Sequence, residues 1–197
     1  FYSVKVNIKS GTQTVQQTML YASKDGKQLL AGTIFDLDTP LPPAEEEEEE
    51  KPELVKSDRP EVELFVMSHC PYGTQMEKGI LPVVELLGEK IDFNVRFVYY
   101  AMHGEKEVIE QTRQYCIQQG QTAKFTGYLN CFLADGNTER CLLEANIDTE
   151  ALESCFSETD AAFNIMENLN DSSKWLNGRF PKFDIDAELN TAYGVGG

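Results

Sequence analysis

Residues 61–97 constrain the fold most, because three segments of different hydrophobic period follow one another there. Residues 62–67 form a nearly continuous apolar run, which is typical of a strand buried on both faces. Pro71 then opens a stretch in which apolar residues recur at helical spacing up to Gly88. Apolar and polar residues alternate over 91–97, as in a second strand. This order predicts a βαβ unit with parallel strands.

Two regions of different character precede this unit. Residues 1–38 alternate apolar and polar side chains and contain the turn signal Asp25-Gly26, so we predict a small antiparallel β meander. Residues 39–60 hold five prolines and a run of six glutamates. Prolines favour extended backbone and like charges repel, so we expect an acidic, solvated linker there. The main domain is then residues 61–197.

The rest of the main domain is predicted to be helical. Helical periodicity, glycine stops and capping residues place helices at 105–118, 123–133, 140–145, 148–165 and 186–193. The fold class is therefore α/β, with a helical insertion at about residues 104–175 that follows the second strand.

Charge and hydropathy exclude two classes of partner. The net charge is 17 − 33 = −16, whereas a nucleic-acid binder needs a basic surface. No apolar run approaches the ~20 residues of a membrane-spanning helix. We therefore expect no nucleic-acid partner and no membrane span in this chain, and no cofactor.

Cys70 stands where a thiol can react. It follows a strand and precedes the proline that opens a helix, so it faces unpaired N–H groups and the positive end of the helix dipole. Both stabilise a thiolate, which is the nucleophile in disulfide exchange. A buried cysteine at a strand end is the alternative. His69 would assist the thiol or shuttle protons, and Tyr72 would shape access to it.

The run Cys70-Pro71-Tyr72-Gly73, placed between a hydrophobic strand and a helix, resembles the active-site turn of thioredoxin-fold proteins. The stretch 114–125 is similar to the helical insert of the DsbA and DsbC branch of extracytoplasmic disulfide oxidoreductases. Residues 186–197 resemble the helix and turn before their cis-proline loop, and residues 21–37 are loosely similar to the dimerisation region of the isomerase branch.

This resemblance implies a thioredoxin-like βαβ core and thiol–disulfide exchange on protein disulfides or with a redox partner. It implies an extracytoplasmic location, periplasmic, cell-surface or secreted, and a possible homo-oligomer through residues 1–38. Gly73 occupies the position of the family's second active-site cysteine, which leaves a single-thiol, isomerase-like or glutathione-assisted reaction. The family continues to a cis-proline and two more strands, so we expect a longer natural chain and an incomplete domain over 61–197.

Four other cysteines cluster within forty residues: Cys116, Cys131, Cys141 and Cys155. They allow two bridges in three connectivities, and paired cysteines indicate an oxidising compartment, whereas four reduced core thiols are the alternative. The insert of the isomerase branch carries a structural disulfide, so the resemblance makes Cys116 one candidate half. We favour Cys131–Cys141, which flank a turn, with Cys116–Cys155, and the other connectivities stay open. The spacings do not match a zinc site.

Two other functions remain open, and the enzymatic nature of the protein is undecided. A binding or assembly module that keeps the fold without turnover suits Gly73, the β meander and the charged linker. Copper(I) binding is the third hypothesis, because parallel strands end at one edge and could gather soft ligands there. The residues concerned are Met67, His69, Cys70, Met76, Met102 and His103.

Overall fold

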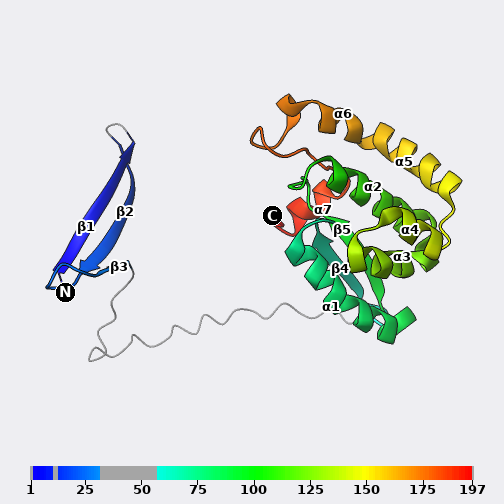
Figure 1. The fold of residues 1–197 in the computed structure, drawn as a ribbon, viewed down its shortest axis with the longest axis horizontal. Coiled ribbons are helices and arrows are strands. Elements are labelled where there is room, and N and C mark those ends of the chain that lie inside the picture. Colours follow the sequence, from blue (N-terminus) through cyan, green and yellow to red (C-terminus); the bar gives the residue numbers. More distant parts are fainter. Residues whose placement is uncertain (1, 11–12, 32–56, 197) are drawn as a thin grey trace. The chain divides into compact units, whose positions relative to one another are not determined.

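The structure, a computed structural model, describes residues 2–10, 13–31 and 57–196. The chain divides into two compact units, Phe1–Leu54 and Val55–Gly197, which are described separately below (Figure 1). Most of the predicted linker at 39–60 and the last part of the predicted meander lie outside the described residues.

The first unit contains a three-stranded antiparallel sheet in the order β1-β2-β3. The strands are β1 (Tyr2–Ser10), β2 (Gln13–Ala22) and β3 (Leu29–Ala31). Between β2 and β3 the carboxylate of Asp25 accepts a hydrogen bond from the Lys27 N–H at 3.1 Å, and Gly26 adopts a φ of 70°. Glycine tolerates this backbone conformation without steric cost, which confirms the turn expected at Asp25-Gly26.

The second unit starts with the βαβ arrangement that the sequence predicts. Strand β4 (Glu61–Val66) is followed by α1 (Pro71–Leu87), a short 3₁₀ turn η1 (Gly88–Lys90) and β5 (Asp92–Phe97). The two strands pair in parallel, from Glu61 opposite Asp92 to Val66 opposite Phe97. Parallel pairing places both strand ends at one edge of the sheet, and Cys70 follows β4 at that edge. The domain is thus mixed α/β.

Seven further elements follow β5 in chain order. They are α2 (Glu105–Gly120), α3 (Thr122–Asp135), α4 (Thr138–Glu144), α5 (Thr149–Phe163), α6 (Ile165–Asn170), the 3₁₀ turn η2 (Ser172–Lys174) and α7 (Ala187–Ala192). Side-chain caps explain two of the starts, because Asn137 accepts a hydrogen bond from the Arg140 N–H and Asp148 from the Ala151 N–H. Figure 1 shows α2 inside the helical layer, with α5 and α6 along one side of it.

One predicted helix is divided in the structure, and the ends of the other four differ from the prediction by at most two residues. The sequence predicts a single helix over 148–165, but the structure ends α5 at Phe163 and starts α6 at Ile165. Asn164 between them adopts a left-handed conformation, with φ 53° and ψ 41°, which asparagine tolerates better than most residues. No helix among the described residues has the length and apolar character needed to cross a membrane.

Two disulfides tie the helical layer together, in the connectivity that the sequence analysis favoured. Cys116 of α2 is bonded to Cys155 of α5, and Cys131 of α3 is bonded to Cys141 of α4. The Cα–Cα distances are 5.7 and 5.4 Å, within the ordinary range for a disulfide. With all four sulfurs paired, the alternative of a four-thiolate zinc site does not apply.

Side chains complete the outer edge of β5. The amide of Gln118 donates to the Val95 carbonyl at 3.0 Å and accepts from the Val95 N–H at 2.8 Å. Two residues do the same for Phe97: Asp186 accepts from its N–H at 2.8 Å and Asn190 donates to its carbonyl at 2.9 Å. The N–H and the carbonyl of both Val95 and Phe97 are thereby hydrogen-bonded without a neighbouring strand on this side.

Candidate functional site

Cys70 is the N-cap residue of α1, and Pro71 occupies the first helical position. Its φ of −72° and ψ of 123° are extended, and its N–H donates to the Met67 carbonyl at 3.0 Å, which closes a turn from Met67 to Cys70. All five cysteines lie in the described residues, and Cys70 is the only one that is not in a disulfide. It is half-buried, so the thiol lies at a helix start and not deep in the core.

The first turns of α2 hold the backbone of this Met67–Cys70 turn. The N–H of Ser68 donates to the side-chain oxygen of Gln111 at 3.3 Å, and the N–H of His69 donates to Oε1 of Glu107 at 3.1 Å. Both acceptors are fully buried. The two central N–H groups of the turn are therefore satisfied by side chains from another element, which fixes the turn to α2.

Glu107 also binds the loop that follows β5. Its Oε2 accepts from the His103 N–H at 3.0 Å, and its Oε1 accepts from Nδ1 of the His103 ring at 2.8 Å. The carboxylate is buried with 0% of its side chain exposed, while that of His103 is 32% exposed. One carboxylate thus contacts the loops that end both parallel strands.

The side chain of His69 leads away from the sheet edge toward α3. Its Nδ1 lies 3.1 Å from the Ser68 hydroxyl, and its ring packs edge-to-face on Phe132 at a centroid distance of 5.6 Å. Burial, and next the nearby charge of Lys106, lower the pKa of His69. Both effects disfavour the imidazolium form that would stabilise a neighbouring thiolate. A role for His69 in the chemistry of Cys70 stays a prediction.

Cys70 itself packs on a small apolar cluster, here called the satellite cluster. Its buried members are Met67, Val98 and Tyr100, and its partly buried members are Cys70, Tyr99, Leu176, Phe180 and Val195. Burial raises the pKa of Tyr100, and the charges of Tyr99 and Cys70 raise it further. Tyr72, which the sequence places beside the thiol, is 84% exposed. The thiol therefore belongs to an apolar cluster that contains three aromatic side chains, Tyr99, Tyr100 and Phe180.

Gly73, three residues after Cys70, is enclosed by the end of β4. A Cβ atom at this position would lie 3.1 Å from the Met67 carbonyl oxygen and 3.2 Å from Cβ of Val66. Contacts this short require the neighbouring atoms of Met67 and Val66 to give by a few tenths of an ångström. The absence of a second thiol from the turn therefore coincides with close packing of α1 on β4.

The residues of the copper(I) hypothesis lie in different environments. Met67 is buried in the satellite cluster, Met76 and Met102 are exposed, and His103 Nδ1 is bound by Glu107. Among the described residues no group of three or more His, Cys, Asp or Glu side chains could hold a metal ion.

The buried polar residues of α2 were not predicted from the sequence. Five of them follow one face of α2 at helical spacing, all at most 5% exposed: Glu107, Glu110, Gln111, Gln114 and Gln118. Glu110 binds Arg113, Gln114, Tyr128 and Thr138. The signal for them was a polar stripe with the period of a buried helix face.

Glu77 is the exception in this polar interior. It belongs to α1, is 1% exposed, and neither carboxylate oxygen has a hydrogen-bond partner among the described residues. Burial, and next the charge of Glu110, raise the pKa of Glu77 to about 8. Glu77 is therefore mostly a neutral acid at neutral pH, since an unpaired buried carboxylate is strongly disfavoured.

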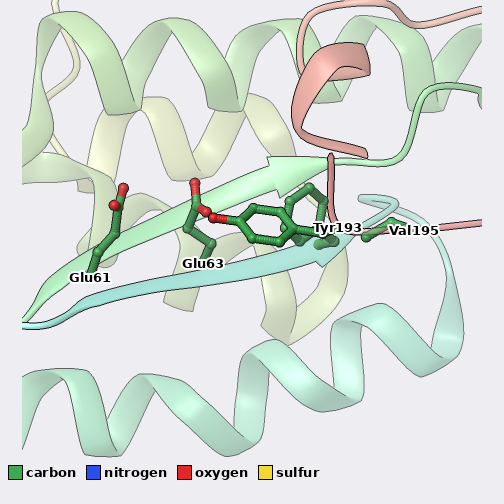
Figure 2. A pocket seen from close by; sticks show the side chains of 5 residues that line it. Glu61, Glu63, Tyr193 and Val195 are labelled. Carbon is green, nitrogen blue, oxygen red and sulfur yellow. The ribbon is translucent and has the colours of Figure 1, made fainter. Parts of the chain in front are cut away.

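A shallow pocket of about 360 Å³ lies on the face of β4 opposite the core and does not contain Cys70. Figure 2 shows Glu63 of β4 at the hydroxyl end of the Tyr193 ring, with Glu61 further along the strand and Val195 at the opposite end of the pocket. Glu63 is bound by Arg96 at 2.6 Å, and hydrogen bonding to Glu63 raises the pKa of Tyr193. These polar groups already serve one another, so the thiol at the sheet edge remains the stronger candidate site.

Comparison of the chain with family models, with curated proteins and with solved structures finds no match.

Proposed function

We propose that this protein is a thiol–disulfide exchange protein with a thioredoxin-like fold that acts through the single thiol of Cys70. The observation that carries the proposal is the position of Cys70, which is free and half-buried at the N-cap of α1, whereas the other four cysteines are disulfide-bonded. A helix start supplies unpaired N–H groups and a positive dipole end, both favourable to a thiolate. The parallel β4–α1–β5 unit and the helical insertion support the thioredoxin-like assignment.

The proposed reaction is attack by the Cys70 thiolate on a substrate disulfide. The Sγ atom forms a new S–S bond to one substrate sulfur, and the other sulfur leaves as a thiolate, so the step conserves electrons and atoms. Gly73 offers no resolving thiol in the turn. The mixed disulfide is therefore resolved by another cysteine of the substrate, which gives isomerisation, or by a small thiol such as glutathione, which gives net reduction at the expense of that thiol.

The two disulfides support an extracytoplasmic location. Disulfides persist in oxidising compartments and are rare in the cytosol of mesophiles. Protein disulfides or a redox partner in such a compartment are the proposed substrates.

A non-catalytic binding module is the second candidate, and the packing at Gly73 favours it. The turn carries no second thiol, and a Cβ at Gly73 would lie 3.1–3.2 Å from Met67 and Val66, so a complete dithiol cycle is not available within it. In this case the fold serves recognition, and Cys70 is dispensable.

Alkylation of the native protein followed by peptide mass mapping tests the proposal. Cys70 should be labelled within minutes, and the other four cysteines only after reduction and unfolding. The protein should accelerate refolding of a scrambled disulfide substrate in glutathione buffer, and Cys70→Ser should abolish the acceleration. Acceleration that survives in Cys70→Ser would overturn the role of Cys70, and wild-type activity no higher than that of free thiol would favour the binding module.

A further inference from the structure

We propose that Glu107 is a positioning residue for the Cys70 thiol, and that its charge is required because one carboxylate holds both loops at the sheet edge. This inference rests on the proposed function of Cys70. It concerns how the thiol is placed, and not whether substrate touches Glu107.

The Glu107 carboxylate accepts hydrogen bonds from both loops. Three N–H groups point at the two oxygens of Glu107: those of the His69 and His103 backbone and Nδ1 of the His103 ring, at 2.8 to 3.1 Å. The side chain is fully buried, so water cannot replace a lost partner. A carboxylate accepts at both oxygens, whereas an amide of the same shape accepts at only one and carries two donors.

The bond from the His69 N–H to Glu107 holds the turn that carries the thiol. The His69 N–H belongs to the peptide bond that joins Ser68 to His69, inside the turn that ends at Cys70. Gln111 holds the preceding N–H, of Ser68, at a longer distance of 3.3 Å. Loss of the Glu107 bond frees the turn to rotate about its ends, and Cys70 moves with it. Small displacements of a reacting group reduce rates strongly.

His103 is held by Glu107 through its ring as well as through its backbone. Donation from Nδ1 to a buried carboxylate fixes the ring in the tautomer that carries its proton on Nδ1. The bond from His103 Nδ1 to Glu107 also ties the loop after β5 to the start of α2. His103 directly precedes Gly104, the N-cap residue of that helix, and Glu107 lies in its first turn. Glu107 therefore joins both loops through hydrogen bonds that an uncharged side chain cannot reproduce together.

The test compares Glu107→Gln with Glu105→Gln in the full chain. Glu105 is an exposed acid in the first turn of the same helix, and no hydrogen bond joins its side chain to another described residue. We expect the rate of Cys70 with a small aromatic disulfide to fall about tenfold or more in Glu107→Gln and to stay within about twofold in Glu105→Gln. Nitrogen-15 spectra should show the His103 ring leaving the Nδ1–H tautomer in Glu107→Gln only.

A folded Glu107→Gln protein with the wild-type rate would overturn the inference. If Glu107→Gln does not fold, His103→Phe is the second variant, because it keeps an aromatic ring and removes the Nδ1 donor to Glu107. It should slow Cys70 about threefold, and an unchanged rate in it would also overturn the inference. Failure of the proposed function appears separately, as wild-type Cys70 that reacts no faster than a cysteine peptide.

Discussion

The helical layer and the β4–α1 junction use cysteine in different ways. In the helical layer, four cysteines on facing helices form two covalent bridges, α2 to α5 and α3 to α4. At the junction, a single cysteine is the N-cap residue of a helix, and the N–H groups of its turn donate hydrogen bonds to Glu107 and Gln111. The side chain is the same in both regions, and the surrounding elements decide whether it is disulfide-bonded or free.

The difference shows how rigidity is obtained in each region. A disulfide restricts the unfolded chain and needs no contribution from the thiolate form. A thiol that is to react must stay unpaired, so its position depends on buried polar contacts, which are effective only when complete. Two buried polar groups of α2, Glu107 and Gln111, supply these contacts at the junction.

Removal of the longer bridge should produce the largest loss of stability. Cys116 and Cys155 are 39 residues apart, and the chain-entropy relation gives about 4 kcal/mol for a loop of that size. We expect Cys116→Ala/Cys155→Ala to lower the free energy of unfolding by about this amount in urea titrations.

The shorter bridge provides the matched comparison. Cys131 and Cys141 are 10 residues apart, which gives about 3 kcal/mol by the same relation. If the two regions are independent, Cys70 should be alkylated at the wild-type rate in both folded double variants. A large change in Cys70 reactivity on loss of either bridge would contradict the contrast drawn between the regions.

Glu77 should make the junction sensitive to pH. Its pKa is about 8 in the folded protein against 4.5 for the free group, so folding favours the protonated form. The free energy of unfolding due to this group is therefore highest below about pH 4.5 and falls by about 1.4 kcal/mol per pH unit up to pH 8. Glu77→Gln should remove this slope and be more stable than the wild type by up to about 3 kcal/mol at pH 7.

Urea unfolding of both proteins between pH 5 and 9 measures the effect. The relevant quantity is the wild-type curve minus the variant curve, because other groups that titrate contribute equally to both. Glu89→Gln, at an exposed position just after α1, serves as the control. Parallel wild-type and Glu77→Gln curves would show that Glu77 is ionised or solvated in the folded state.

The smallest expected effect distinguishes two glycines of α1. Gly79 has no atom within 4 Å of a Cβ position, so Gly79→Ala should stabilise the protein by about 0.5–1 kcal/mol through helix propensity. Gly73→Ala should instead destabilise it by about 1 kcal/mol, because the new methyl group meets Met67 and Val66. Thermal unfolding of both variants measures the opposite signs, and equal gains would show that the approach of α1 to β4 is loose.

Much of the α/β framework could be predicted from the sequence. The apolar run at 62–67 and the alternation at 91–97 correspond to β4 and β5, and Pro71 does open α1. Such features are local, since hydrophobic period and capping residues act within one element. The break at Asn164 was missed because the apolar pattern continues across it, and only the backbone conformation reveals it.

The surroundings of Cys70 were less predictable. Glu107 and Gln111 resemble solvent-exposed helix residues when they are considered one at a time, but tertiary packing buries them against the Met67–Cys70 turn. Their partners are 38 and 43 residues away in the chain, and no local rule connects such positions. The i, i+4 spacing of His103 and Glu107 was the one visible sign of the pair.

The side chains along β5 have a consequence for self-association. An open strand edge offers N–H and carbonyl groups to any passing chain and is a common origin of edge-to-edge aggregation. On β5, Gln118, Asp186 and Asn190 occupy the outward groups of Val95 and Phe97. Polar residues that look misplaced in an apolar interior therefore act as a barrier that closes this side of the sheet to intermolecular strand addition.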